Sequence, residues 1–209
     1  MMLQVRINEN DYDRVILAIK PLEKTEESVL KTAVNNTARR ARTQLVSRAT
    51  KRYAGKDVAG RSALMQASDI QTATTSDVRA ILYFKSPMNE IGQFHVSSLE
   101  VSKTAYNKNG KRRKKNIKGN VLNGPSKKLN NAFVVQFKSG HKAVVSRENG
   151  INMKKYAGKP KIPHYEKLKK LLSPNVPEMI SNAEVYKPDE IGQILHEEVN
   201  KLLVKVSGG

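Results

Sequence analysis

The spacing of apolar residues along the chain predicts a mixture of strands and helices. Near the N-terminus, Leu3, Val5 and Ile7 alternate with polar residues, which is the period of a half-buried strand. A short helix is expected from Asp11 to Lys20, where the spacing changes to that of a helix face. From Pro188 to Val206, apolar residues again recur every three or four positions, which predicts an amphipathic C-terminal helix.

The clearest predicted helix runs from Glu26 to Arg52. Acidic residues at its start and basic residues at its end suit the helix dipole. One stripe of its surface is apolar or small and comprises Leu30, Ala33, Val34, Thr37, Ala41, Leu45 and Ala49. The other face is basic and carries Lys31, Arg39, Arg40, Arg42 and Arg48. Such a helix would be about 40 Å long, so we expect it to be the main packing element of the fold.

Two pairs of segments rich in β-branched and aromatic residues predict hairpins. The first pair is Asp69 to Ala73 and Val78 to Lys85. The second is Ala132 to Phe137 and His141 to Arg147, joined by a turn that contains glycine. We expect both hairpins to lie in one antiparallel sheet, covered by the 26–52 helix.

Shorter elements complete the expected fold. The pattern predicts single helical turns at Ser62 to Ala67 and Tyr165 to Leu172, and a short helix from about Pro177. The predicted fold class is α+β: an antiparallel sheet of hairpins packed against a long N-terminal helix, with a C-terminal helix and a projecting basic loop. We expect a single domain over residues 1–209, with residues 101–130 as a basic loop or arm inserted in it.

Charge is the most unusual property of the sequence. It holds 38 Lys and Arg against 19 Asp and Glu, a formal net charge of +19 at pH 7. Between Glu100 and Glu148 there are thirteen basic residues and no acidic one. Five basic residues are consecutive, namely Lys111, Arg112, Arg113, Lys114 and Lys115. Burying such a run is too costly, so we expect it to contact a polyanion or an acidic protein.

Acidic residues, in contrast, gather toward the C-terminus. We nominate Glu197 and Glu198 as candidate subunit contacts, because separated charge favours contact between identical copies, as in a ring. The basic face of the long helix, with Arg39, Arg40 and Arg42, suits either phosphate or an acidic C-terminal helix of another copy. The sequence alone does not separate these two possibilities.

The sequence offers little for catalysis. It has no cysteine, no phosphate-binding glycine loop and no nucleophile elbow. His196 begins a motif like that of zinc proteases, but Asn200 stands where the second histidine would be. Glu100 and Lys103 are a poor basis for a magnesium nuclease, because the charged residues around them are cations. We therefore expect no enzymatic activity, no metal and no cofactor. Without an apolar span or signal region, we also expect a soluble chain that is not exported.

The order of several segments resembles the prophage minor tail protein Z family. These segments are the alanine- and arginine-rich helix at 33–42, the later basic insertion, the hairpin with its Ala132 to His141 and Val144 to Arg147 parts, and the stretch from Lys170 to Ile180. The resemblance extends from about Lys31 to Val206. It implies a structural virion protein of the phage tail, acting without catalysis at the head-proximal end in tail completion or head–tail joining.

The resemblance also implies partners. We expect a homo-oligomeric ring, taken as a hexamer, together with other tail proteins such as the tail tube or tail terminator, and transient contact with DNA but not with a membrane. Such a protein would be assembled in the host cytoplasm and end in the virion tail. The run from Lys111 to Lys115 would meet DNA or an acidic partner, and the lack of interleaved aromatic residues favours the protein partner. An alternative is a cytoplasmic protein that binds nucleic acid without sequence specificity.

Overall fold

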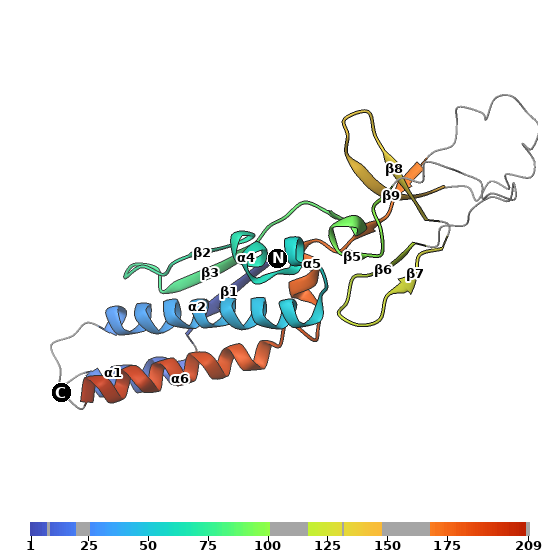
Figure 1. The fold of residues 1–209 in the computed structure, drawn as a ribbon. Helices are drawn as coiled ribbons and strands as arrows, with labels where there is room; N and C mark the ends of the chain where they lie inside the picture. Colours follow the sequence, from blue (N-terminus) through green and yellow to red (C-terminus); the bar gives the residue numbers. More distant parts are fainter. Residues whose placement is uncertain (8, 20–25, 101–116, 131, 148–167, 208–209) are drawn as a thin grey trace, which may run out of the picture. The chain divides into compact units, whose positions relative to one another are not determined.

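The computed structural model describes residues 1–7, 9–19, 26–100, 117–130, 132–147 and 168–207 (Figure 1). By their contacts, the residues group into two compact units, which are described separately. Unit 1 consists of Met1–Arg52, Gly60–Pro87 and Asn175–Gly209, and unit 2 of Tyr53–Ala59 and Met88–Pro174. The expectation of one domain over residues 1–209 stays a prediction.

Unit 1 contains an antiparallel sheet with the strand order β1-β3-β2. These strands are β1 (Met2–Arg6), β2 (Ser68–Gln71) and β3 (Arg79–Phe84). Strand β3 is central and pairs through Leu82 with Leu3 of β1 and with Ile70 of β2. Its side chains alternate in burial, as the period of two requires for a sheet with one covered face. The N-terminal strand and the first hairpin are therefore confirmed.

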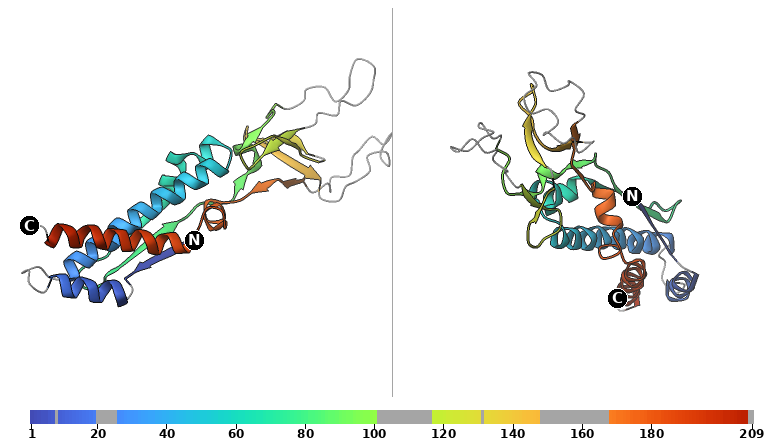
Figure 2. Two further views of the ribbon diagram at one scale, coloured as in Figure 1. Left: turned by 90° about the horizontal axis from the view of Figure 1, so that it is seen from below. Right: turned by 90° about the vertical axis from the view of Figure 1, so that its right-hand side faces the viewer.

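The helices of unit 1 are α1 (Glu9–Ile19), α2 (Glu26–Arg52), α4 (Arg61–Gln66), α5 (Val176–Ser181) and α6 (Pro188–Ser207). Helix α2 lies between the sheet on one side and the helices α1 and α6 on the other (Figures 1 and 2). All seven residues of its predicted apolar stripe are buried. The long helix, the C-terminal helix and the α+β class are confirmed, and burial between two layers explains why the stripe is rich in alanine.

Helix α5 begins with a capping box, which explains the short helix expected near Pro177. The Asn175 side chain accepts a hydrogen bond from the Glu178 backbone N–H at 2.9 Å, and the Glu178 carboxylate accepts one from the Asn175 N–H at 2.9 Å. The two bonds satisfy amides that would otherwise have no partner in the first turn.

Unit 2 is built from short strands. They are β4 (Asn89–Glu90), β5 (His95–Val96), β6 (Lys118–Asn120), β7 (Lys127–Lys128), β8 (Phe133–Gln136), β9 (Lys142–Arg147), β10 (Leu168–Lys170) and β11 (Leu172–Ser173), with helix α3 (Lys56–Ala59) and the 3₁₀ turn η1 (Ile91–Gln93). The sheet orders are β10-β9-β8, β5-β6-β7 and β11-β4. A small core of Ile91, Ile117, Ala132 and Val144 joins these strands.

Gly55 in unit 2 occupies a position that only glycine fits well. Its φ is +94°, in the left-handed region. A Cβ added there would lie 2.9 Å from the backbone oxygen of Gln93, which is closer than real Cβ contacts. The residue thus allows the 53–59 segment to approach the turn after η1.

The expectation that both hairpins share one sheet was wrong. The first hairpin belongs to the unit 1 sheet, where β1 takes the other side of β3. The second hairpin forms β8 and β9 of unit 2, with β10 on the other side of β9. The physical reason is that each hairpin has its own apolar neighbours. Val144 of the second hairpin packs with Ile91, Ile117 and Ala132 rather than against α2.

Two further segments differ from expectation. Of the predicted helical turn at Tyr165 to Leu172, the described residues form strands β10 and β11, because β9 offers a free edge with which Lys170 pairs through Val145. Of the predicted basic loop at 101–130, residues 101–116 lie outside the described residues. Residues 117–130 form β6 and β7, and Ile117 is buried in the core of unit 2.

Candidate interaction surfaces

The basic residues of α2 face the acidic residues of α6 within one chain. Arg40 donates one hydrogen bond to Glu198 at 2.7 Å and another to Glu197 at 2.8 Å. Lys201 Nζ lies 3.1 Å from the same Glu198 carboxylate. Glu198 is only 7% exposed, so its charge needs these partners.

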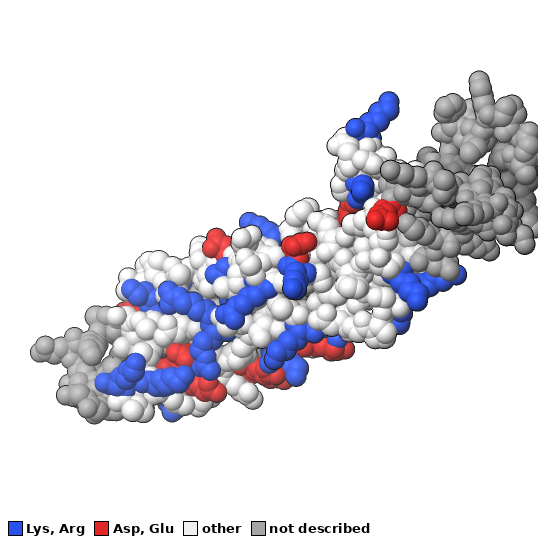
Figure 3. Space-filling model, viewed as in Figure 1, with Lys and Arg blue, Asp and Glu red and all other residues white. Residues whose placement is uncertain are grey.

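The same pairing continues along both helices. Arg48 pairs with Glu190, and Arg52 pairs with Glu184 just before α6. Figure 3 shows the acidic side chains gathered over α6, next to the basic side chains of α2. The partners run in opposite order along the two segments, as antiparallel packing requires. This matched spacing was the signal in the sequence from which the contact could have been predicted.

The nominated subunit contacts Glu197 and Glu198 therefore have partners inside their own chain. Charge complementarity, which we interpreted as a contact between copies, is satisfied when α6 packs on α2. Glu197 remains 55% exposed at its side chain, whereas Glu198 does not. Contact of these residues with another subunit stays a prediction.

The pKa values in this cluster follow from the contacts. Burial alone would raise the pKa of Glu198, but hydrogen bonds from Lys201 and Arg40 outweigh it and hold the pKa below its ordinary value. Hydrogen bonds to Glu197 and Glu198 raise the pKa of Arg40. Both shifts favour the charged forms of Glu198 and Arg40, whose ion pair joins α2 to α6.

Of the other basic residues nominated on α2, Arg42 contributes to the fold itself. Its guanidinium donates to the backbone oxygens of Met65 at 2.6 Å and Ser68 at 2.8 Å, and to the Ser68 hydroxyl at 2.7 Å. Arg39 is exposed and donates to Asn36 at 3.3 Å. Arg39 is thus better placed for an outside partner than Arg42.

His196 joins α6 to α1 instead of starting a zinc motif. Its Nδ1 lies 2.9 Å from an Asp11 oxygen, and Asp11 is 2% exposed. Asn200, one turn further, accepts a hydrogen bond from Arg14 at 2.7 Å. Across the described ranges, no group of three or more His, Asp or Glu residues is placed to hold a metal ion.

The two units differ sharply in charge. By sequence, the ranges of unit 2 carry 21 Lys and Arg against 5 Asp and Glu, a net charge of +16. The ranges of unit 1 carry 17 against 14, a net charge of +3. Almost all of the excess positive charge therefore belongs to unit 2, which includes the run from Lys111 to Lys115. That run lies outside the described residues.

One acidic residue of unit 2 is engaged at its second hairpin. The Glu90 carboxylate lies 2.6 Å from Lys170 Nζ and 3.0 Å from His141 Nε2. Burial alone would raise the pKa of Glu90, but hydrogen bonds from Lys170 and His141 outweigh it and lower the pKa. Phe137 stacks on His141 and lies under the Lys170 ammonium group.

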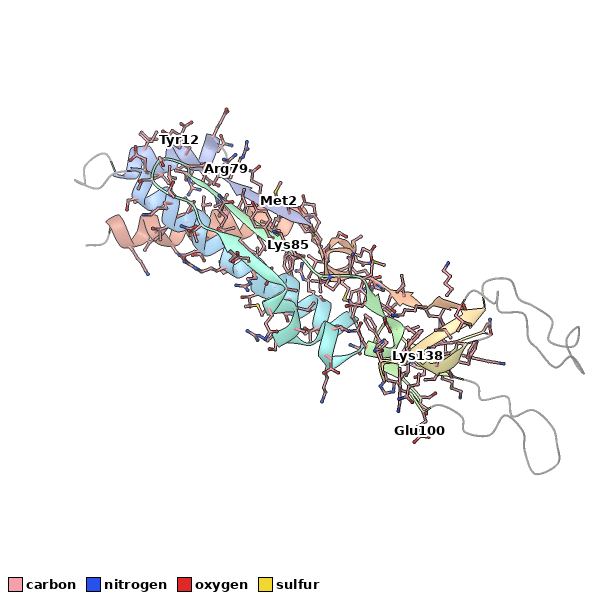
Figure 4. The ribbon with its side chains drawn as sticks, turned by 90° about the horizontal axis from the view of Figure 1, so that it is seen from above. Met2, Tyr12, Arg79, Lys85, Glu100 and Lys138 are labelled. Atoms are coloured by element: carbon pink, nitrogen blue, oxygen red, sulfur yellow. The ribbon has the colours of Figure 1, made fainter. Side chains whose placement is uncertain are left out.

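Many lysines of the described part of unit 2 are exposed. Exposed lysines on its strands and turns are Lys118, Lys127, Lys128, Lys138, Lys142, Lys169 and Lys170. Lys138 lies in the turn between β8 and β9 (Figure 4). Unit 2 thus presents a basic surface that suits an acidic partner or a polyanion.

Comparison with known protein families indicates the kind of assembly in which this basic surface acts. Residues 13–205 match the family model of the prophage minor tail protein Z (GPZ). The chain belongs to this family. The resemblance seen in the sequence is confirmed, and minor tail protein Z is a structural component of the virion tail. Searches of curated proteins and of solved structures found no match. Among the described helices of this minor tail protein, none is long and apolar enough to cross a membrane.

Proposed function

We propose that this minor tail protein is a component of a ring at the head-proximal end of the tail, where it acts in tail completion or head–tail joining. The observation that carries the proposal is the division of charge, with +16 in unit 2 and +3 in unit 1. A joining component needs one surface that packs and another that meets a partner of opposite charge.

Unit 1 has the properties of the packing part. Its layers are held together by a buried apolar stripe on α2 and by ion pairs between α2 and α6. Because most of its charges are balanced, copies of unit 1 can approach each other without strong repulsion. In this proposal, unit 1 forms the ring, which contains six copies of the chain.

Unit 2 has the properties of the joining part. A net charge of +16 on so few residues repels itself and is stabilised by an acidic neighbour. We favour an acidic surface of another tail protein, such as the tail tube or the tail terminator. Aromatic side chains that would stack on bases do not interleave with the Lys111 to Lys115 run.

The test replaces all five residues of this run with serine and examines assembled particles. The matched control exchanges lysine for arginine and arginine for lysine at the same positions, so that the charge is kept. We expect both proteins to melt at the same temperature and only the serine variant to leave heads and tails unjoined in electron micrographs. Normal joining by the serine variant would contradict the proposed role of the charge.

Binding of nucleic acid is the second candidate function, and the same charge of unit 2 favours it. It is separated by the salt dependence of duplex DNA binding. If the run contacts phosphates, the serine variant should have a slope shallower by up to about 0.9 for each lost contact, whatever the DNA sequence. If the run contacts an acidic protein, the slope should not change although joining is lost.

A further inference from the structure

Among the described strands, β8 lies at one edge of the sheet β10-β9-β8. Its partner β9 occupies one side, with Val134 opposite Val144 and Gln136 opposite Lys142. An outer strand exposes a row of backbone N–H and C=O groups with which another extended chain can pair. Such pairing at β8 requires that its outward N–H and C=O groups have no hydrogen-bond partner already.

The hairpin turn determines this direction. The Phe137 N–H donates to the His141 oxygen at 2.8 Å, so these two residues form a hydrogen-bonded pair. Bonded and non-bonded pairs alternate along an antiparallel ladder, which makes Gln136 and Val134 the non-bonded positions. Their N–H and C=O groups therefore point away from β9. The opposite side agrees, because the Val144 oxygen points toward β10 and accepts from Leu171 at 3.0 Å.

These outward groups of β8 are available. Within the part of the chain that the structure describes, no backbone hydrogen bond joins the outward groups of Val134 or Gln136 to another residue. The Gln136 side chain is exposed and reaches only the Gly140 oxygen, at 3.5 Å. The edge thus offers two N–H donors and two C=O acceptors in a row.

Two other edge strands of unit 2, β10 and β7, are protected in a way that β8 is not. Strand β10, at the other edge of the same sheet, carries Lys169 and Lys170, and β7 consists of Lys127 and Lys128. Lysines on an edge strand hinder pairing with further strands. Strand β8, with the sequence Phe-Val-Val-Gln, carries no charge. Its composition favours pairing, whereas the lysines of β10 and β7 oppose it.

Charge decides which chain fits this edge. Lys138 lies two residues after the end of β8, Lys142 lies opposite Gln136, and both are exposed. A second copy would bring another unit of net charge +16 against the first, which opposes pairing. Backbone groups in a row at strand spacing match a polypeptide and not the phosphates of a nucleic acid.

We propose that β8 is a strand-addition site for an extended acidic segment of another tail protein. The inference rests on the proposed function in that it names the kind of partner that unit 2 meets. Backbone bonds to Val134 and Gln136 would hold the added strand, and the lysines around the hairpin would select acidic side chains at its ends.

The test uses the full chain and a fluorescent capped peptide of about six residues that alternates valine and glutamate. The variant Gln136→Pro removes one outward N–H but no bond to β9, since that N–H does not belong to the ladder. Gln136→Ala is the matched control, because it removes the same side chain and keeps the N–H. Two control peptides carry lysine in place of glutamate or methyl groups on alternate backbone nitrogens.

We expect Gln136→Ala to bind the acidic peptide as the wild type does and Gln136→Pro to bind it about tenfold more weakly, at an unchanged melting temperature. Both control peptides should fail to bind. Equal binding by Gln136→Pro, or no binding by the wild type, would overturn the proposal. Self-association of the wild type that Gln136→Pro abolishes would identify a second copy as the occupant and overturn it too.

Failure of this proposal is distinguishable from failure of the proposed function. Suppose that Gln136→Pro keeps peptide binding while the serine variant of the 111–115 run loses head–tail joining. The strand-addition site at β8 is then contradicted, and the proposed function is supported. Suppose instead that peptide binding behaves as expected and the serine variant joins heads and tails normally. The proposed charge-dependent joining is then contradicted, and the strand-addition site at β8 is supported.

Discussion

Replacing Arg40 with methionine removes the cation of α2 that bonds both Glu197 and Glu198 of α6. The methionine keeps much of the apolar stem but leaves Glu198, which is 7% exposed, without one of its two cationic partners. Loss of one partner from a buried ion pair costs about 3–5 kcal/mol. Arg40 is 35% exposed and Lys201 still contacts Glu198, so we expect a smaller loss, about 2 kcal/mol of unfolding free energy.

The pH dependence of the unfolding free energy is a second, independent test of this contact. The pKa of Glu198 is lowered in the folded protein, so its contacts contribute stability above the unfolded pKa of about 4.3. That contribution is lost as the pH falls through the folded value. We therefore expect the difference between wild type and Arg40→Met to be largest near pH 7 and to narrow below about pH 4.

Urea unfolding followed by circular dichroism measures both effects. Arg39→Met is the matched control, because Arg39 is on the same helix, is exposed and bonds only weakly to Asn36. We expect this control to stay within about 0.5 kcal/mol of the wild type. If Arg40→Met is as stable as Arg39→Met at pH 7, or if its deficit does not depend on pH, the cluster does not hold α6 to α2 in the way argued above.

Two further changes test the packing of each unit. Leu45→Asp places a carboxylate at a position that is 2% exposed in α2, and should cost several kcal/mol and abolish the cooperative melt of unit 1; an unchanged melting curve would refute the assigned face. Gly55→Ala forces a side chain into a φ of +94° and against the Gln93 oxygen, and should cost about 1–3 kcal/mol. A serine at the exposed Gly140, which has open space around it, should cost less, and equal losses at both positions would contradict the close approach at Gly55.

Much of the local structure could be predicted from the sequence. The residues of the α2 stripe are all buried, and the bounds Glu26 and Arg52 coincide with the expected ones. Strand β1, both hairpins and helix α6 also occur where the periodicity placed them. These features are readable because the side of a helix or strand that faces a core shows in the spacing of its own residues.

The pairing of these elements depended on the tertiary structure. Periodicity shows that Val144 and Leu82 face a core, but not that they face different cores. It shows that Glu198 lies on α6, but not that Arg40 of the same chain reaches it. It could not predict that residues 168–170 would extend along β9, where a free edge overrides a helical pattern. The sequence alone therefore determined the elements and the total charge. Contacts between distant residues decided which sheet each hairpin joined, which charges were neutralised within the chain and which of the described strands lie at sheet edges.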